Sequence, residues 1–290
     1  MRSDARRRSR EAVSRMRVFP RFVPNPAARS AAVASASLIA ASIAAPAWAG
    51  PPAITWGSAT TIAGDTDVST SGTLLYAYNV GWNGTTGGPG GTPGTGVAAA
   101  TVNGVTFSAF GLPGGYTNYE STVTFGSVTM TESPGFLWSS NNLGNASGLS
   151  SSYQSLLASG GGASNPSTIT VTLGGLTVGQ QYQLQIWSNN SGNGNGTYFT
   201  PIANTLVSSD VTLDANTTNT SGGVGQYVLG TFTAATTSMN FTLDGTGAFN
   251  SSPMINAFQV RDITPIPGPG GLALALGLGA AGAGGRRRRR

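Results

Sequence analysis

Short apolar runs closed by turn residues constrain the fold of this chain more than any other feature. Runs rich in Thr, Val, Tyr, Phe and Leu are separated by clusters of Gly, Asn, Ser and Pro, and no long stretch has the apolar period of a helix. Within residues 168–173 threonines alternate with Ile169, Val171 and Leu173, so one face of that strand would be buried. The pattern predicts an all-β chain with strands near residues 53–61, 73–79, 100–110, 121–131, 168–173, 181–187, 206–214, 227–234, 238–243 and 255–263.

Ten or so short strands in one chain fit a two-sheet sandwich, most simply a jelly roll. Two consecutive small sandwiches, divided near residues 159–166, are the alternative. We favour a single β-sandwich domain over residues 50–264, because the last strand could pair near the first. Asn103-Gly104 predicts a hairpin turn within residues 100–110, and residues 153–158 are the one expected helical turn.

Residues 1–49 have the layout of a secretory signal peptide. Nine arginines between Arg2 and Arg29 precede an apolar run of small residues, and Ala47-Trp48-Ala49 forms an A-x-A cleavage signature. Cleavage after Ala49 would begin the mature chain at Gly50, with either Met1 or Met16 as the start. The chain is therefore expected to be exported.

Residues 265–290 have the layout of a sorting tail. A proline turn precedes an apolar Gly/Ala/Leu segment, and the chain ends in the basic cluster Arg286, Arg287, Arg288, Arg289 and Arg290. The apolar segment is close to the roughly 17–25 residues that a membrane helix needs. The arginines would hold its end on the cytoplasmic side.

This three-part layout resembles the PEP-CTERM sorting signal of bacterial exported proteins. Pro267 and Pro269 correspond to its proline pair, and Gly268 stands where the family usually has Glu. The resemblance implies recognition by an exosortase, with the chain held in the membrane through its C-terminal segment before processing. It would then remain at the cell envelope, the cell surface or the extracellular matrix. The alternatives are a permanent C-terminal anchor and a disordered basic tail.

Residues 168–262 resemble the later half of galactose-binding-like jelly rolls. The resemblance rests on residues 176–184, which enter a strand from a turn, on residues 225–233, and on the closing strand at residues 255–260. This sandwich is shared by many carbohydrate-binding modules. The resemblance therefore implies extracellular polysaccharide as a candidate partner.

Charge argues against nucleic acid as a partner. The whole chain has a formal charge of +5, but between residues 50 and 285 Arg261 is the one base. The same span has eight acids and a formal charge of about −7: Asp65, Asp67, Glu120, Glu132, Asp210, Asp214, Asp244 and Asp262. Nucleic-acid affinity depends largely on Lys and Arg that neutralise phosphates, so no nucleic-acid binding is expected.

Composition also excludes most catalysis. The chain has no His, Cys or Lys, which excludes Ser–His–Asp and Cys–His systems, Schiff bases and zinc sites built on His or Cys. Paired carboxylates remain, and glycoside hydrolysis needs two of them across a cleft. Glu120 and Glu132 are the candidates for a carbohydrate-active hydrolase, provided that a hairpin near residues 125–127 brings them together. Solvated charges at strand ends are the alternative.

Aspartates offer a candidate site for a hard cation. Asp65 and Asp67 alternate in a polar turn, and Asp262 on the closing strand could share the same ion. Ca²⁺ takes six to eight oxygen ligands, and a structural Ca²⁺ would stabilise a domain that lacks disulfides. Capping of the turn by Asp65 and Asp67 is the simpler alternative.

Aromatic residues in loops are candidates for stacking on sugar rings. Trp138, Tyr116, Tyr119 and Tyr198 lie in or beside polar loops, which are the usual place for recognition on a rigid sandwich, whereas Trp56 and Trp187 are expected in the core. The Thr runs do not recur at a fixed period, which argues against a regular ice-binding face.

Together these features predict an exported, non-enzymatic β-sandwich protein that contacts polysaccharide. A hydrolase using Glu120 and Glu132 is one alternative, and a purely structural matrix protein without a specific ligand is the other.

Overall fold

Strands form most of the regular structure, as the sequence pattern predicts. The computed structural model describes residues 53–85, 95–113, 121–135, 137–163, 166–192, 199–203, 210–246 and 252–265. The predicted signal peptide and residues 266–290 of the predicted tail lie outside these ranges, so the structure is that of the predicted sandwich domain.

The strands are β1 (Thr55–Trp56), β2 (Thr60–Thr61), β3 (Thr73–Trp82), β4 (Ala100–Val102), β5 (Val105–Leu112), β6 (Thr122–Phe125), β7 (Val128–Ser133), β8 (Trp138–Ser140), β9 (Gly160–Gly162), β10 (Thr168–Gly174), β11 (Gln181–Ser188), β12 (Phe199–Ala203), β13 (Val211–Asp214), β14 (Gln226–Thr233), β15 (Ser238–Asp244), β16 (Met254–Ile255) and β17 (Ala257–Asp262). An α-helix, α1 (Ser151–Leu157), and a 3-10 helix, η1 (Asp65–Asp67), complete the described elements. No helix in the described ranges is both long and apolar enough to cross a membrane.

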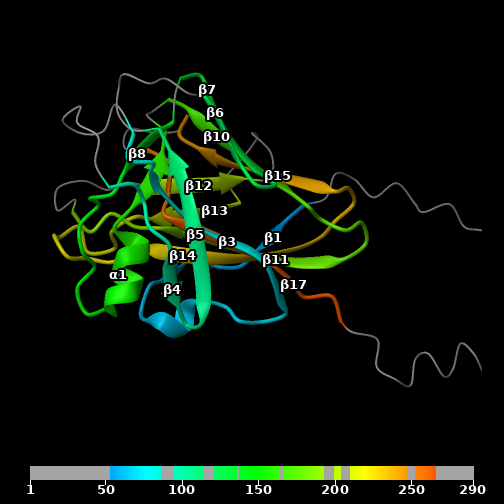
Figure 1. Cartoon of the computed structure of the whole chain (residues 1–290), viewed down its shortest axis with the longest axis horizontal. Coiled ribbons are helices and arrows are strands. Elements are labelled where there is room, and N and C mark those ends of the chain that lie inside the picture. Colours follow the sequence, from blue (N-terminus) through cyan, green and yellow to red (C-terminus); the bar gives the residue numbers. More distant parts are fainter. Residues whose placement is uncertain are drawn as a thin grey trace, which may run out of the picture. The chain divides into compact units, whose positions relative to one another are not determined.

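Two large sheets build a β-sandwich (Figure 1). The eight-stranded sheet has the order β1-β14-β11-β17-β3-β5-β4, with β2 also paired to β14. The six-stranded sheet has the order β13-β12-β15-β10-β7-β6, and a small sheet has the order β16-β9-β8. Both large sheets combine strands from before and after residues 159–166, which fits one sandwich rather than two. The all-β, jelly-roll-like fold class is thus confirmed.

The closing strand pairs differently from the expectation. β17 lies between β11 and β3, with Ala257 opposite Asn79, whereas β1 pairs with β14 at the edge of the sheet. The last strand therefore occupies the middle of the eight-stranded sheet. Its burial agrees with this place, since five of its six residues are buried.

Tight turns divide two of the expected strands. Asn103 and Gly104 have φ angles of 49° and 73°, and they join β4 to β5 as the predicted hairpin turn. A second hairpin at Gly126 (φ 59°) divides the expected strand at residues 121–131 into β6 and β7. Side chains rarely adopt these positive φ angles, so Asn and Gly suit the two turns.

The main core lies between the two large sheets. Alternate residues of β10 point into it, and so do alternate residues of β11 and β17. All seven of these side chains are fully buried: Ile169, Val171, Leu173, Leu184, Ile186, Phe258 and Val260. Burying an aliphatic or aromatic side chain of this size contributes about 1.5–3 kcal/mol, so the alternation predicted from sequence is the main source of stability.

A second core covers the outer face of the eight-stranded sheet. Tyr153 and two leucines of α1 pack there beside Trp187 and Phe107, whose rings meet edge to face at 5.5 Å. Trp187 Nε1 donates a hydrogen bond to the Tyr153 hydroxyl at 2.8 Å. The core position predicted for Trp187 is confirmed, and Trp56 is a partly buried residue packed against the main core.

Candidate functional site

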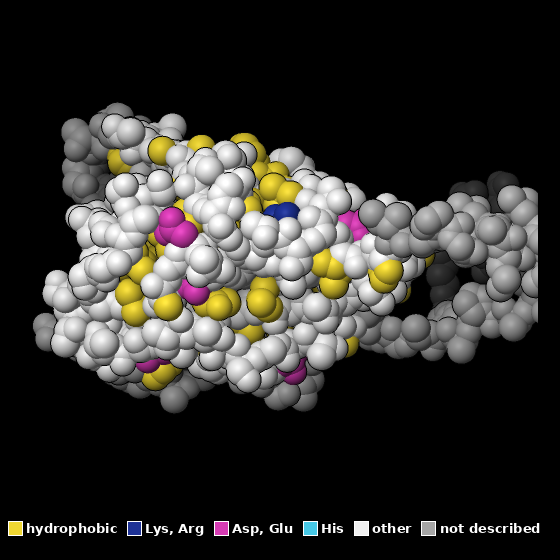
Figure 2. Space-filling model, turned by 90° about the horizontal axis from the view of Figure 1, so that it is seen from below, with side chains coloured by type: hydrophobic (Ala, Val, Ile, Leu, Met, Phe, Trp, Pro, Cys, Tyr) yellow, Lys and Arg dark blue, Asp and Glu magenta, His cyan; other side chains and the backbone are white. Residues whose placement is uncertain are grey.

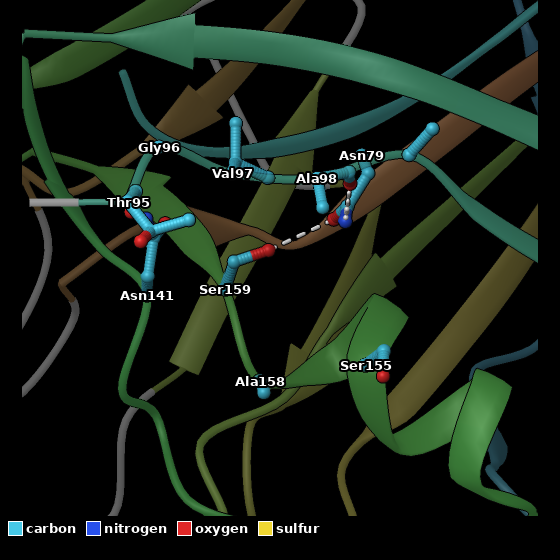
Figure 3. Close-up of a pocket in the computed structure, with 10 residues that line it drawn as sticks. Asn79, Thr95, Gly96, Val97, Ala98, Asn141, Ser155, Ala158 and Ser159 are labelled. Atoms are coloured by element: carbon cyan, nitrogen blue, oxygen red, sulfur yellow. Dashed lines mark hydrogen bonds between the residues drawn. The ribbon is translucent and has the colours of Figure 1, made fainter. Parts of the chain in front are cut away.

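A pocket of about 350 Å³ lies beside the C-terminal end of α1 (Figure 3). The segment that leads into β4 forms one wall, and the end of α1 lies on the opposite side. Its lining residues carry amide, hydroxyl, methyl or no side-chain groups: Asn79, Thr95, Gly96, Val97, Ala98, Ala99, Asn141, Ser155, Ala158 and Ser159. The pocket is therefore walled by neutral groups.

Asn79 connects two walls of this pocket. On β3, Tyr78 and Val80 point into the main core, so Asn79 between them faces the opposite side of the sheet. The Ser159 hydroxyl donates to Asn79 Oδ1 at 2.9 Å, and Asn79 Nδ2 donates to the Ala98 carbonyl at 2.9 Å (Figure 3). Because Asn79 is only 2% exposed, these bonds satisfy its amide within the protein.

Asn141 holds the segment that precedes β4. Its Oδ1 accepts from the Trp82 N–H at 2.8 Å, and its Nδ2 donates to the carbonyls of Trp82 at 3.2 Å and Thr95 at 3.1 Å. Gly81 permits this approach, since a Cβ there would lie 2.6 Å from Asn141 Oδ1 and 2.8 Å from Ser159 Cβ. The residues that surround the pocket are thus fixed by hydrogen bonds.

Two hydroxyl groups of the lining keep acceptor capacity. Ser155 Oγ donates to the Ser151 carbonyl at 2.9 Å, and Ser159 Oγ donates to Asn79, but both oxygens retain lone pairs. The lining has no acid, base or activated nucleophile. Its chemistry suits hydrogen bonding to a neutral ligand and gives no means of general acid–base catalysis.

Trp138 is part of the hydrophobic packing of the small sheet. It lies half-buried on β8 and packs against the cluster formed by Leu143, Ala215 and Met254. A Cβ at Gly162 would lie 2.5 Å from its ring, so β9 passes directly against the indole. Its proposed role in sugar stacking stays a prediction. The other three candidates, Tyr116, Tyr119 and Tyr198, lie outside the described residues.

Asp65 and Asp67 organise the turn at η1. The Ser150 hydroxyl, which caps α1, donates to Asp65 Oδ1 at 2.6 Å. Asp67 Oδ2 accepts from the N–H groups of Ala63 at 2.7 Å and Gly64 at 2.9 Å. These hydrogen bonds fit the simpler alternative, in which Asp65 and Asp67 cap the turn.

The three candidate metal ligands do not form one group. Asp262 Oδ1 accepts from the Thr264 N–H at 2.8 Å at the end of β17. Within the ranges that the structure describes, no three His, Cys, Asp or Glu side chains come together as metal ligands. The structure therefore does not bring Asp65, Asp67 and Asp262 together as the expected shared Ca²⁺ site.

Glu132 is a buried carboxylate at the end of β7. It shares the inward face of this strand with Val128 and Met130 and is 4% exposed. Burial raises its pKa, while the Ser167 hydroxyl acts in the opposite direction, and Oε2 has no hydrogen-bond partner. Glu120 lies outside the described residues, so the carboxylate pair of the hydrolase alternative stays a prediction.

Arg261 has a structural role that the sequence did not indicate. It is 7% exposed and holds the loop that follows η1. Nε donates to the Ser71 carbonyl at 2.7 Å, and one terminal nitrogen donates to the carbonyls of Thr70 and Gly72, both at 3.1 Å. The other terminal nitrogen donates to Gln259 Oε1 at 3.2 Å. Arg261, the one base between residues 50 and 285, therefore holds the backbone of this loop.

Glutamine side chains continue this buried polar layer on the outer face of the eight-stranded sheet. Gln259 Nε2 donates to Gln185 Oε1 at 2.8 Å and to the Ser69 carbonyl at 3.0 Å. Gln185 Nε2 donates to the Asp67 carbonyl at 2.7 Å.

The surface shows little positive charge. On the face drawn in Figure 2, the colour of Lys and Arg is confined to one small area. A patch of positive charge for an anionic partner is not seen on that face.

Comparisons with known proteins assign no family. No protein-family model matches the chain, and no curated protein has a similar sequence. A solved structure from a study of the promiscuous specificity of carbohydrate-binding modules of the β-sandwich superfamily aligns with 74% of this chain and 98% of its own. The identity is 13% and the TM-score is 0.20, which is too low for that structure to indicate a ligand or a family for this chain.

Proposed function

We propose that this chain is an exported, non-enzymatic β-sandwich protein of the cell envelope or extracellular matrix that binds a neutral sugar unit of a polysaccharide. The observation that carries the proposal is the pocket beside α1, whose neutral lining combines hydroxyl and amide groups with the methyl groups of Val97, Ala98, Ala99 and Ala158. Its volume of about 350 Å³ is at the lower end of the roughly 300–1,000 Å³ of small-molecule sites. A ligand of one or two sugar rings suits this size.

Charge narrows the ligand class further. An anionic ligand needs Arg, Lys or a helix N-terminus, yet the pocket lies at the C-terminal end of α1 and Arg261 is buried against backbone carbonyls. A cation would need carboxylates, and none lines the pocket. Neutral polyols, which present only hydroxyl and ether oxygens, remain the class that the lining can satisfy.

A pair of serines on α1 gives a matched test. Ser155 is exposed and lines the pocket, whereas Ser152 is exposed on the same helix and does not line it. We expect the purified full chain to bind neutral glycans on an array, with Ser155→Trp weakening the best hit at least tenfold and Ser152→Trp leaving it unchanged. Absence of any glycan hit, or equal binding by Ser155→Trp, would contradict the proposal.

Export and sorting rest on the two ends of the chain. The signal-peptide layout of residues 1–49 and the proline turn, apolar segment and arginines of residues 265–290 support transient membrane anchoring and processing by an exosortase-type enzyme. Deletion of residues 286–290 is expected to change the mass and the surface retention of the protein in an exosortase-containing bacterium. An unchanged mature mass and location would contradict the sorting proposal.

A further inference from the structure

Two Asn-Gly pairs of the chain lie within the described residues. Asn83-Gly84 follows β3, and Asn103-Gly104 joins β4 to β5. Both asparagines are exposed. Two further pairs, at residues 193–196, lie outside the described ranges. The two described pairs have the same dipeptide sequence, but their amide groups make different contacts.

The side-chain oxygen of Asn83 accepts two hydrogen bonds from Thr85. The Thr85 N–H donates to Asn83 Oδ1 at 2.9 Å, and the Thr85 hydroxyl donates to the same atom at 2.7 Å. The first bond is that of an Asx turn, in which an Asn side chain folds back over the peptide that follows it. The amide carbon of Asn83 is therefore held toward the Asn83–Gly84 peptide, and two donors polarise its carbonyl.

The amide of Asn103 is held through its nitrogen instead. Asn103 Nδ2 donates to the Val68 carbonyl at 2.9 Å, which lies 35 residues earlier in the chain. Among the described residues, no group donates to Asn103 Oδ1. The hairpin between β4 and β5 also fixes the Asn103 backbone, which has a φ of 49°. This amide is therefore tied to another segment rather than to the peptide that follows it.

We propose that the fold makes Asn83 a site of intramolecular deamidation and protects Asn103 from the same reaction. The Gly84 backbone nitrogen gives its proton to solvent and forms a bond to Asn83 Cγ. The bond between Cγ and Nδ2 then breaks, and Nδ2 takes up a proton and leaves as ammonia. The product is a succinimide ring, which water opens at either carbonyl to give aspartate or isoaspartate.

The contacts of Asn83 favour the first step of this reaction. Negative charge develops on Oδ1 as the Gly84 nitrogen adds to Cγ, and both Thr85 donors already point at that oxygen. Gly84 has no Cβ to hinder the approach of its nitrogen. At Asn103 the amide would first have to leave its bond to Val68. The same dipeptide is thus activated at one position and restrained at the other.

The proposed modification site adjoins the candidate pocket. A Cβ at Gly96, which lines the pocket, would lie 2.7 Å from the Asn83 carbonyl oxygen, so the two backbone segments are in contact. Deamidation would add a negative charge beside a wall whose lining residues are neutral. The isoaspartate product would also insert the Asn83 Cβ into the main chain at this contact.

The test follows the two asparagines in the purified full chain during incubation in mildly alkaline buffer. Arg261 is the one basic residue between residues 50 and 285, so digestion uses pepsin rather than trypsin, at an acid pH that slows further deamidation. Mass spectrometry of the peptides then gives the aspartate and isoaspartate formed at each position. We expect Asn83 to react at least tenfold faster than Asn103 in the folded chain, and both to react at similar rates in concentrated urea.

Two substitutions of Thr85 provide a matched pair. Thr85→Val removes the hydroxyl donor and gives both positions the same Asn-Gly-Val sequence, whereas Thr85→Ser keeps the hydroxyl. Thr85→Val should slow the reaction of Asn83 several-fold, Thr85→Ser should keep the wild-type rate, and Asn103 should be unaffected by either. Equal rates at Asn83 and Asn103 in the folded wild type would overturn the proposal. So would a wild-type rate in Thr85→Val, or a preference for Asn83 that persists undiminished in urea.

Discussion

The outer faces of the two large sheets differ in almost every respect. The eight-stranded sheet is covered by α1 and by the loop after η1, with a buried layer of Gln and Arg side chains and a second apolar core between them. The outer face of the six-stranded sheet presents threonines of β6, β7 and β10 that are exposed or half-exposed. One sandwich thus offers a pocket among hydrogen-bonded residues on one side and a surface of threonines on the other.

This difference shows that the role of a polar residue on a strand depends on whether another part of the chain packs over it. On the covered face, Gln185, Gln259 and Arg261 fix a loop by bonds to its backbone. On the open face, threonines bond to one another across strands and leave their outer surface to solvent. Substitutions should therefore affect stability strongly on the first face and weakly on the second.

Removal of the Arg261 guanidinium should have the largest effect. Arg261→Met keeps an apolar stem but leaves the carbonyls of residues 70–72 without their charged donor. Hydrogen bonds to charged groups contribute about 1.5–3 kcal/mol each, with incomplete additivity. We expect urea denaturation to show a loss of about 3 kcal/mol in the free energy of unfolding. A loss below about 1 kcal/mol would mean that the loop holds its position without Arg261.

Removal of the Tyr153 hydroxyl should have a smaller effect. Tyr153→Phe leaves the Trp187 indole N–H buried without an acceptor, which costs about 1–3 kcal/mol. Trp187→Phe provides the control for a double-mutant cycle. Once the indole is absent, the same Tyr153→Phe change should cost clearly less, and an equal cost in both backgrounds would contradict the coupling.

Glu132 should make stability depend on pH. Burial raises the pKa of Glu132 in the folded protein, so the folded state binds this proton more tightly than the unfolded state. The stabilisation that this causes is fully present below the unfolded pKa of about 4.3 and is lost as pH rises through the folded pKa. Glu132→Gln should therefore be more stable than wild type at pH 7 and lose its advantage near pH 4, as measured by urea denaturation at each pH. A lower stability of the variant at pH 7 would indicate that the charged carboxylate is stabilised.

Removal of one hydroxyl from the open face should have the smallest effect. Thr129→Val deletes a single interstrand hydrogen bond to Thr124 and keeps the branched shape that strands favour. We expect a change within about 0.5 kcal/mol of the free energy of unfolding. A loss as large as that of Arg261→Met would remove the contrast between the two faces.

Local patterns account for the parts of the fold that the sequence predicts well. The alternation in residues 168–173 matches β10, Asn103-Gly104 forms the turn between β4 and β5, and the expected helical turn corresponds to α1. Each of these features depends on residues that are close together in the chain. Strand alternation and the preference of Asn-Gly for positive φ angles can therefore be read from the sequence.

Long-range contacts account for what could not be predicted. β9 consists of three glycines, and nothing in its composition favours a strand; it forms by pairing with β8 and β16. Glycine is needed there because a Cβ at Gly162 or Gly161 would collide with Trp138 or Leu112. The donors of Arg261 meet a loop that lies about 190 residues earlier in the chain. The candidate pocket likewise combines β3, the segment before β4 and the end of α1.

The assignment of ligand binding to the pocket can be tested in one measurement. Glycan-array binding by Ser155→Trp and Thr170→Tyr, prepared side by side as full chains, compares the pocket with the outer face of the six-stranded sheet. We predict that Ser155→Trp binds the best wild-type glycan at least tenfold more weakly, while Thr170→Tyr binds it like the wild type. Equal binding by the two variants, whether both keep the wild-type value or both lose it, would contradict the assignment of sugar binding to the pocket.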